Sequence, residues 1–588
     1  MPTINNPRIF LWGALALILY VDYDAWMRDY APPLPAPTSA ASAQHPGASA
    51  APAPDLGSHV PEAPPAAGTA GTAGAAASSA TTSATTLATA PAAAAPVSTG
   101  ADATEAQAAS GAPVVHVRTD VLDVEISTRG GTIAQADLIG YPKVKGETAP
   151  VRLENHDSPE TLYALQSGLA GSADGTYPTH LAAFTSTQDN YSLDRAADLR
   201  VPLTWHSDDG VAVTKTYVFH RGSYRIDLDY EVHNGGSHAW EARSYAQILR
   251  NDPPTKRSYF NTDSYANHGP AIWDGKFRRL DVKDEKEKQL SLDVGGGWIA
   301  ALQHYFVSAV VPPRDATYHF TLKVAGDQYL LAAEGPPRMI APGADGVFAE
   351  TLFIGPKLQR ALDATAPGLD YVADYGRLWF FAQPLFKALS WMHGLTGNWG
   401  AAIILVTVLL KLLFYPLSEA SGRSMAKMKT LQPRIKNLQE TYADDREKLG
   451  RAMMELYKRE KVNPVAGCLP TLIQIPVFIA YYWVLLESVE MRQAPFAFWI
   501  HDLSSRDPLY ILPAIMAVAM FVQYKLNPAP PDPVQAKVFM IMPLVMSVTF
   551  AFFPAGLVLY WVTNTVLSIA QQWNINRRIG ALAAAKNT

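Results

Sequence analysis

The chain has 588 residues, a length that suits several domains, and 48% of them are apolar while only 17% are charged. Its 10% aromatic content excludes a wholly disordered chain, and the long apolar runs of the C-terminal third argue against a wholly soluble one. The net charge of −5 gives no case for direct nucleic-acid recognition. The single cysteine, Cys468, excludes an intrachain disulfide.

A short apolar run at residues 9–21 is the first predicted element. Arg8 precedes it and two aspartates, Asp22 and Asp24, follow it, a charge bias that places the N-terminus in the cytoplasm. A cleaved signal peptide is the alternative, but bulky and acidic residues stand where a small-x-small cleavage site belongs. We therefore predict an uncleaved signal-anchor helix over residues 1–24.

Residues 25–113 form the next predicted region. From residue 31 onward they are mainly Ala, Pro, Thr, Ser and Gly, with no aromatic residue and no Lys or Arg. Such a composition cannot bury enough apolar surface to offset the entropy of ordering the chain. We predict a flexible tether that carries no chemistry and can be deleted.

From residue 114 to about 370 the pattern changes to short alternating strands. The clearest hairpin has a turn at 221–223. Its predicted apolar positions are Val211, Val213, Thr216 and Val218 before the turn, and Tyr224, Ile226, Leu228, Tyr230 and Val232 after it. Alternation at period two puts one face of an antiparallel sheet in the core. We predict a large β-sandwich, outside the cytoplasm because it follows the anchor.

This β-region gives little indication of chemistry. It contains no HExxH, no glycine-rich phosphate loop and no nucleophile elbow. A carboxylate pair for glycoside chemistry stays open as an alternative to solvated strand faces. We expect no catalytic residues, no metal, no cofactor and therefore no enzyme.

Residues 371–576 are predicted to be a helical membrane region. The aromatic-rich stretch 377–395 is interrupted by Pro384, Lys387 and His393, which suits a helix lying in the membrane interface. Further apolar segments predict spans at about 398–417, 465–486, 509–524, 538–553 and 555–572. The last two are joined by a turn at 553–556. With the anchor, this makes six transmembrane helices.

The charges between the spans predict their orientation. The segment 419–461 holds eleven Lys and Arg residues, whereas the loop 488–507 has only Arg492 and Arg506. By the positive-inside rule the first is cytoplasmic and the second lies outside. The short tail 577–588, which begins with two arginines, falls in the cytoplasm, so both termini are predicted there.

The basic segment 419–461 has helical periodicity of its own. Apolar residues recur at three- and four-residue spacing at Met425, Met428, Leu431, Ile435 and Leu438, and again at Leu449, Met453 and Leu456. The sequence predicts a cytoplasmic helical hairpin, kinked at Pro433, with an N-cap at 444–445 before its second arm. This hairpin is either a self-contained coiled coil that only satisfies the topology or a docking surface for a partner or for anionic lipid. The docking candidates are Arg423, Lys427, Lys429, Arg434 and Lys436.

Lys411 is the most informative residue of the membrane region. It lies twelve residues after Trp399, so about 18 Å further along a helix and inside the inner half of the bilayer. Such a cation costs about 2.5–3.5 kcal/mol on insertion scales and normally faces a wet or protein-lined space. A lysine that snorkels to the headgroups is the alternative. Other polar residues within the apolar runs favour a shared hydrated groove, namely Thr407, Gln474 and Asn564 with the aromatic pair Tyr560 and Trp561.

Several motifs of the helical region resemble the YidC/Oxa/Albino family of membrane insertases. They are the sequences at 383–386 (QPLF), 397–400 (GNWG), 415–417 (YPL), 425–428 (MAKM), 431–433 (LQP), 461–464 (KVNP), 467–470 (GCLP), 492–496 (RQAPF) and 556–561 (GLVLYW). The β-region matches less densely, at 129–132 and 296–300, and resembles the Gram-negative form of the family. The tether looks like an insertion.

The resemblance implies a fold and a function. The fold is a polytopic α-helical membrane protein with a five-helix insertase core, a periplasmic β-supersandwich and a cytoplasmic hairpin, in the bacterial inner membrane. The function is insertion, folding and assembly of membrane proteins, alone or with the Sec translocon. Lys411 occupies the place where the family usually has Arg, and Trp561 a place where Tyr is commoner. Implied partners are nascent membrane proteins, the Sec translocon, the ribosome, the targeting machinery and lipids.

Two other functions fit parts of the sequence. A secondary transporter or channel for an anionic solute would also use Lys411, but the spans show no internal repeat and no paired broken helices. A membrane-anchored periplasmic glycan-binding or glycan-modifying module would use the β-region, but leaves the later spans and the basic hairpin unexplained.

Overall fold

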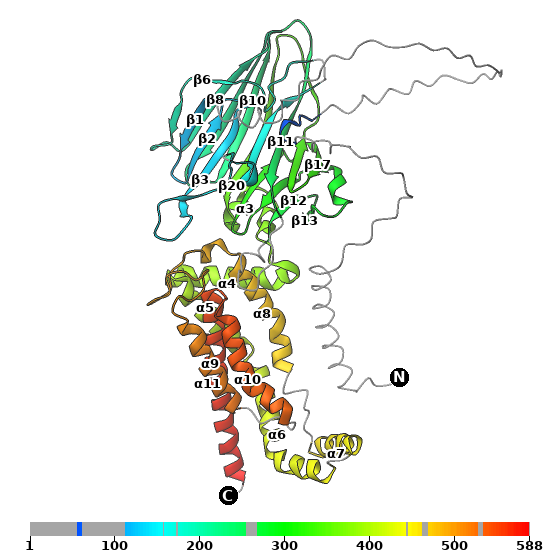
Figure 1. The fold of residues 1–588 in the computed structure, drawn as a ribbon, viewed down its shortest axis with the longest axis vertical. Helices are drawn as coiled ribbons and strands as arrows, with labels where there is room; N and C mark the ends of the chain where they lie inside the picture. The colour runs from blue at the N-terminus through cyan, green and yellow to red at the C-terminus, as the bar shows by residue number, and fades with distance from the viewer. Residues whose placement is uncertain are drawn as a thin grey trace, which may run out of the picture.

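The computed structural model describes residues 56–61, 112–156, 158–171, 175–253, 267–442, 445–460, 469–526 and 533–586. The predicted signal anchor and most of the predicted tether lie outside these ranges. Figure 1 shows a β-sandwich at one end of the molecule, a bundle of helices at the other, and a helical hairpin at the end of the bundle far from the sandwich.

The larger sheet of the sandwich has 11 strands and is antiparallel apart from the β1–β7 pair. Across the sheet they are β14 (Ser291–Gly295), β17 (Thr317–Ala325), β18 (Gln328–Glu334), β11 (Trp240–Asn251), β5 (Tyr163–Ala170), β3 (Thr132–Pro142), β2 (Leu122–Ser127), β1 (Val114–Arg118) and β7 (Asn190–Ser192). Two short strands lie off this path, β19 (Arg338–Ile340) beside β11 and β4 (Pro150–Arg152) beside β3.

The second sheet has nine strands. In order they are β13 (Phe277–Arg279), β12 (Gly269–Trp273), β15 (Trp298–Leu302), β16 (Phe306–Val311), β20 (Asp345–Pro356), β10 (Arg225–Asn234), β9 (Val211–His220), β8 (Asp198–His206) and β6 (Thr185–Ser186). The inward side chains of both sheets form one hydrophobic core, which the short helix α3 (Gln359–Thr365) also joins through Leu362. The predicted β-sandwich is confirmed.

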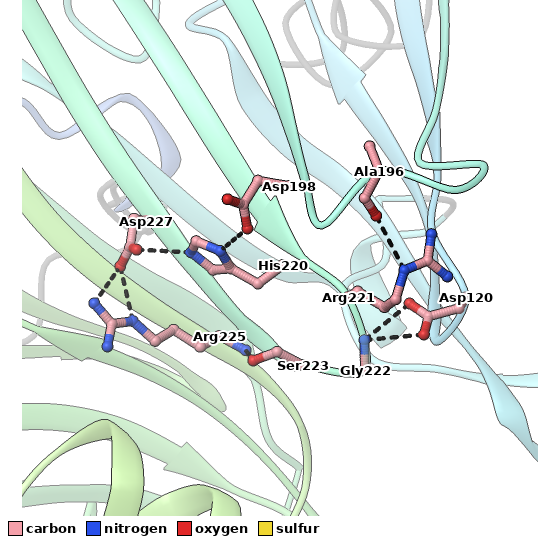
Figure 2. Close-up of polar contacts among 9 residues, drawn as sticks. All are labelled: Asp120, Ala196, Asp198, His220, Arg221, Gly222, Ser223, Arg225 and Asp227. Carbon is pink, nitrogen blue, oxygen red and sulfur yellow. Dashed lines mark hydrogen bonds and ion pairs between the residues drawn. The ribbon is translucent and has the colours of Figure 1, made fainter.

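The predicted hairpin is strands β9 and β10, which pair antiparallel from Val211 opposite Asn234 to Phe219 opposite Ile226. The turn between them is tied by polar contacts, which Figure 2 shows. Gly222 has a positive φ of 67° and donates its N–H to both carboxylate oxygens of Asp120, at 3.0 and 2.9 Å. His220 lies between Asp198 and Asp227, at 2.6 and 2.8 Å, and fixes the ends of three neighbouring strands.

For strand β9, the sequence analysis was partly wrong about which residues face the core. The core-facing residues of β9 are Val211, Val213, Tyr217 and Phe219, and Lys215 occupies the inward position between them. Thr216 and Val218, which the sequence predicted as core positions, lie on the other face and are buried there as well, at 7% and 5% exposure.

Most helices of this region begin and end within about five residues of the predicted ranges, but two predictions were wrong: the last helix continues past residue 572 through most of the predicted tail, and the span predicted at 398–417 is broken at Phe414. The helices are α4 (Trp379–Thr396), α5 (Trp399–Leu413), α6 (Tyr415–Thr441), α7 (Arg446–Arg459), α8 (Leu469–Glu487), α9 (Ile511–Leu526), α10 (Pro533–Phe550) and α11 (Ala555–Lys586). Helix α4 lies between the bundle and the sandwich (Figure 1) and corresponds to the predicted interfacial helix. Within the described ranges, no single helix is long and apolar enough to cross a membrane. One pair, Trp399–Leu413 and Tyr415–Ser424, meets the requirement together and is bent by 60°.

Helices α6 and α7 form the predicted hairpin. Its small core consists of Leu431, Ile435, Leu456 and Tyr457, with Met428, Leu438 and Met453 packed around them. Asp445 caps α7, because its side chain accepts a hydrogen bond from the backbone N–H of Lys448 at 3.0 Å. The N-cap predicted at 444–445 is therefore Asp445.

The sandwich is docked on one end of the bundle. Lys145 donates to the carbonyl of Gln493 at 2.7 Å, and Arg492 donates to the carbonyl of Pro142 at 2.7 Å. The ammonium of Lys357 also lies 3.8 Å from the carboxylate of Glu487, and both side chains are fully buried. The last turn of α8 is therefore held by the sandwich as well as by the bundle.

Candidate functional site

Helix α5 places two of the predicted polar residues, Thr407 and Lys411, on one of its faces. The helix begins where the side chain of Asn398 accepts a hydrogen bond from the N–H of Ala401 at 2.9 Å. Asn398 also donates to the carbonyl of Phe496 at 2.8 Å, which ties the start of the helix to the loop before α9. Thr407 and Lys411 are four residues apart and therefore lie one turn apart on the same side of α5.

Three helices bring the predicted residues together around one cavity. The cavity is lined from α5 and its C-cap by Thr407, Leu410, Lys411 and Phe414, from α8 by Gln474 and Val477, and from α11 by Tyr560 and Asn564. Five of the six predicted groove residues thus share one space. Its volume open to the centre of a water molecule is about 10 Å³, which suits about one water and no peptide.

Lys411 is held at this cavity by a residue that the sequence analysis did not identify. Its ammonium donates to the hydroxyl of Ser568 at 2.8 Å, and that hydroxyl donates to the carbonyl of Asn564 at 2.7 Å. Ser568 lies one helical turn after Asn564, so the i, i+4 spacing was the signal that could have found it. The amine therefore reaches across to α11 within the bundle.

The other lining residues limit how the cavity can interact. Thr407 is 1% exposed, and its hydroxyl donates to the carbonyl of Ile403 at 2.6 Å. Because its proton is used in this way, the hydroxyl can only accept a further hydrogen bond. Tyr560 is packed against two rings, stacked on Phe478 at 5.9 Å and edge-on to Tyr481 at 4.8 Å. Gln474 and Asn564 are half-buried.

Trp561 differs from the prediction because it does not line the cavity. Successive residues of a helix point about 100° apart, so Trp561 diverges from Tyr560 and packs against Phe478 and Phe550, with ring centroids at 4.7 and 5.3 Å. Both rings contact Phe478, but Tyr560 also lines the polar cavity, whereas Trp561 also contacts Phe550 of α10.

Comparisons with known proteins cover nearly the whole chain. The family model described as YidC periplasmic domain matches residues 114–388, and that described as 60Kd inner membrane protein matches residues 391–581. A membrane protein insertase YidC from Thioalkalivibrio sulfidiphilus is 45% identical over 98% of this chain and 99% of its own length. The chain belongs to the YidC family of membrane protein insertases. A relative of the same name from Nitrosococcus oceani is 44% identical over 98% of this chain and 99% of its own.

Solved structures give weaker likenesses. A crystal structure of an active YidC insertase with its first transmembrane domain resolved covers 78% of this chain and 94% of that one, at 19% identity and a TM-score of 0.35. A galactose mutarotase related enzyme from Lactobacillus acidophilus matches 41% of this chain at 11% identity and a TM-score of 0.29. A score that low gives no support to glycan chemistry in this YidC family member.

Family membership also places the two regions. The sandwich and the first part of α4 fall within the match to the YidC periplasmic domain, and α5 to α10 with most of α11 fall within the match to the inner membrane protein. The YidC family implies membrane protein substrates and an inner-membrane location with a periplasmic domain. Among the described residues, no group of three or more His, Cys, Asp or Glu side chains is arranged to hold a metal ion.

The basic residues of the hairpin are presented on α6. Arg423 pairs with Glu419 at 2.6 Å one turn before it, and Arg434 crosses to α7 and pairs with Glu460 at 2.7 Å. Both arginine side chains are more than half exposed, so such pairs contribute little to stability. Lys427 and Lys436 are exposed, and Lys429 lies on the same helix. Four of the predicted docking residues are thus at the surface of the hairpin.

Proposed function

We propose that this chain inserts membrane proteins through the space between α5, α8 and α11, with Lys411 as a single positive point charge. The observation that carries the proposal is the convergence of Thr407, Lys411, Gln474 and Asn564 on one cavity inside an apolar bundle. Polar groups inside an apolar bundle are expensive unless they are paired within the protein or face a water-filled space. The wider hydrophilic groove forms when these helices separate.

The physical reasoning starts from solvation. A polar loop that crosses about 30 Å of hydrocarbon loses its water, and each unsatisfied peptide group costs several kcal/mol. A hydrated cavity partway through the bundle shortens the dry path. Lys411 attracts an acidic translocated terminus more strongly in this setting than it would in water. The substrate's apolar helix then passes into lipid, and the hydrophobic effect makes that step downhill.

The topology belongs to the same proposal. Six spans comprise the anchor at 9–21 and the five segments of the helical region, with both termini in the cytoplasm and the sandwich in the periplasm. This orientation puts the α6–α7 hairpin in the cytoplasm, where its basic surface docks the ribosome, targeting machinery, Sec translocon or anionic lipid. The membrane potential assists outward movement of negative residues by about 2.3 kcal/mol per charge at 100 mV.

Charge substitutions at Lys411 test the proposal. Lys411→Arg keeps the charge and should retain insertion, whereas Lys411→Glu should abolish it for substrates with acidic translocated termini. The measurement is protease protection of such a substrate synthesised in the presence of proteoliposomes that contain each variant. A substrate with a neutral translocated segment is the control, because it should depend little on this charge. Normal insertion of the acidic substrate by Lys411→Ala would contradict the electrostatic role.

Depletion of the protein from cells separates the proposal from the two alternatives. Uninserted small membrane proteins accumulate if the chain is an insertase. Loss of uptake of an anionic solute would indicate a transporter, and altered cell-wall glycan would indicate a glycan module.

A further inference from the structure

A short piece of the predicted tether is packed against the sandwich. Residues 56–61, Leu-Gly-Ser-His-Val-Pro, begin with a single 3-10 turn at Leu56–Ser58 and lie beside β11, as the short dark-blue segment of Figure 1 shows. This differs from the expectation that the whole of 25–113 carries no packed residue. Because contacts over a sequence separation of more than a hundred residues hold the segment, the low-complexity composition around it gave no signal.

The surface beneath Leu56 is an apolar patch on the outer face of the larger sheet. Inward residues of the central strands, such as Leu165, Ile248 and Leu331, belong to the sandwich core. Their neighbours in sequence therefore point outward. Three of these outward residues are Ala164, Leu249 and Leu330, which lie opposite one another on β5, β11 and β18 and are 0%, 2% and 1% exposed. Leu56 is buried on them to 6% exposure.

Next to the apolar patch, side chains of the same face donate to the segment's backbone. Gln247, on β11, is fully buried and donates from its amide nitrogen to the carbonyl of His59 at 3.1 Å. His180 is 4% exposed, and its Nε2 lies 3.0 Å from the carbonyl of Gly57. A carbonyl only accepts, so Nε2 carries the proton and donates.

Both donors are held in place by the sheet itself. Gln247 also donates to the side-chain oxygen of Gln166 on β5 at 2.7 Å. The Nδ1 of His180 lies 2.7 Å from the hydroxyl of Tyr245, which fixes the ring. Burial lowers the pKa of His180 to about 4, so the ring is neutral near neutral pH, with Nε2–H free to serve the peptide. Such pre-positioned donors cost little ordering entropy when a ligand arrives.

We propose that this outer face of β5, β11 and β18 is a peptide-binding site, and that residues 56–61 are its ligand within the same chain. The ligand class is a short turn-forming peptide with a leucine anchor followed by two carbonyls that accept from Gln247 and His180. Recognition comes from side-chain donors on the face of the sheet, rather than from addition of a strand to its edge. The proposal is independent of insertion activity.

The first experiment tests whether the segment is seated in the full-length protein. Pro61→Cys and Ser58→Cys are introduced separately in a Cys468→Ser background, so that each protein has one thiol and keeps the leucine anchor. Pro61 is buried and Ser58, three residues earlier, is exposed, which makes them a matched pair. The thiol at position 61 should react with a maleimide roughly ten- to a hundredfold more slowly, as expected for a buried position of a seated segment. Equal rates in the folded protein would overturn the proposal.

The second experiment tests whether the face binds the peptide when it is supplied separately. Residues 54–63 of the full-length chain are replaced by Gly and Ser at equal length, and a fluorescent peptide of residues 52–64 is titrated by anisotropy. Binding to the segment-replaced chain should be saturable. Binding to the wild type should be at least about tenfold weaker, because its own segment competes at an effective concentration near millimolar. A peptide with Leu56→Asp is the control ligand and should not bind.

A further variant links binding to the donors. When Gln247→Leu is added to the segment-replaced chain, its affinity for the peptide should fall by about two- to tenfold, because one hydrogen bond is lost. Failure of the peptide to bind a segment-replaced chain that keeps its far-UV circular dichroism would overturn the proposal. Equal binding of the Leu56→Asp peptide would do the same.

Discussion

The sandwich and the bundle each bury the amine of a lysine, and they hold it very differently. In the sandwich, Lys215 is fully buried and donates to the carbonyls of Gly130 and Ser167 at 2.9 and 3.1 Å. Three rings surround it, with centroids 5.4–5.8 Å from the ammonium. In the bundle, Lys411 is only half-buried. It donates one hydrogen bond, to the hydroxyl of Ser568, and it faces a cavity. The first arrangement encloses the amine between two carbonyls and three rings, whereas the second leaves the amine facing a cavity where it can take a new partner.

The surroundings of Lys215 indicate a structural role. Burial lowers its pKa to about 7, and the nearby charge of Glu350 opposes that shift. Burial likewise raises the pKa of Glu350 to about 7. An amine that the protein encloses on every side has nothing to offer a substrate. Burial of a lysine is therefore not by itself a sign of function; the difference lies in whether the amine has an open side.

The largest expected effect is on Lys215. Lys215→Met removes the donor to two buried carbonyls and leaves Glu350 without its cation, so the free energy of unfolding of the sandwich should fall by about 3–5 kcal/mol. It is measured by urea unfolding of the purified protein, followed by far-UV circular dichroism. The double variant Lys215→Met with Glu350→Gln should recover part of the loss.

Lys411→Met is the matched control in the bundle. It removes one hydrogen bond and one desolvated charge, so stability should change by less than about 1 kcal/mol while insertion of acidic-terminus substrates is lost. The comparison fails if Lys411→Met destabilises the protein as much as Lys215→Met, because the bundle lysine would then be a packing residue too.

A second buried charge joins the two regions. Lys357 of the sandwich faces Glu487 of α8 at 3.8 Å, and burial lowers the pKa of Lys357 against the opposing effect of that carboxylate. Lys357→Met should weaken docking by about 3 kcal/mol, because it leaves a buried carboxylate without its cation. The double variant Lys357→Met with Glu487→Met should be closer to wild type, since both charges are gone. Hydrogen exchange of the amides at 486–493 reports the docking, and unchanged protection in the single variant would contradict it.

The sequence predicted features that follow from local periodicity. The hairpin of β9 and β10 follows from period-two alternation, and the cap of α7 follows from an acidic residue before a helical run. The polar residues of the cavity stood out because each interrupts an apolar segment, and helical spacing put Thr407 on the same face as Lys411.

The features that were missed depend on contacts between distant segments. Lys215 stands at an inward position of β9, but a lysine in an alternating strand indicates a solvated face, so the phase was read from Thr216 and Val218 instead. The partners that satisfy its amine come from residues 130 and 167, which no local pattern connects to it. The packing of Leu56 against three strands was also missed, because no local pattern connects residue 56 to those strands.

A smaller effect is expected at Ser568. Ser568→Ala removes the hydroxyl that holds the amine of Lys411 at the cavity, so the rate of insertion should fall by roughly two- to tenfold, which corresponds to about 0.5–1.5 kcal/mol. Ser568→Thr keeps the hydroxyl and is the control. Both are measured with the acidic-terminus substrate in proteoliposomes. If the alanine variant inserts like wild type while threonine does not, bulk rather than the hydrogen bond matters at this position.

The smallest effect lies at the surface of the sandwich, at the turn that Figure 2 shows. Burial disfavours the charged form of His220, but hydrogen bonds to Asp198 and Asp227 outweigh it and raise the pKa of the imidazole. A raised pKa in the folded state means that the stabilisation is fully present below the unfolded value of about 6.5 and is lost as the pH rises through the folded value. The Tm of the sandwich should therefore decline slightly between pH 6 and pH 8.

His220→Gln keeps a polar side chain without titrating in this range, so its Tm should be flatter over the same interval. The difference should be small because the side chain is 32% exposed and solvent screens the pairs. His206→Gln, at an exposed histidine at the end of β8, is the control for the loss of an imidazole without the two aspartate contacts. An identical slope in wild type and His220→Gln would mean that the two aspartates orient the ring without favouring its charge.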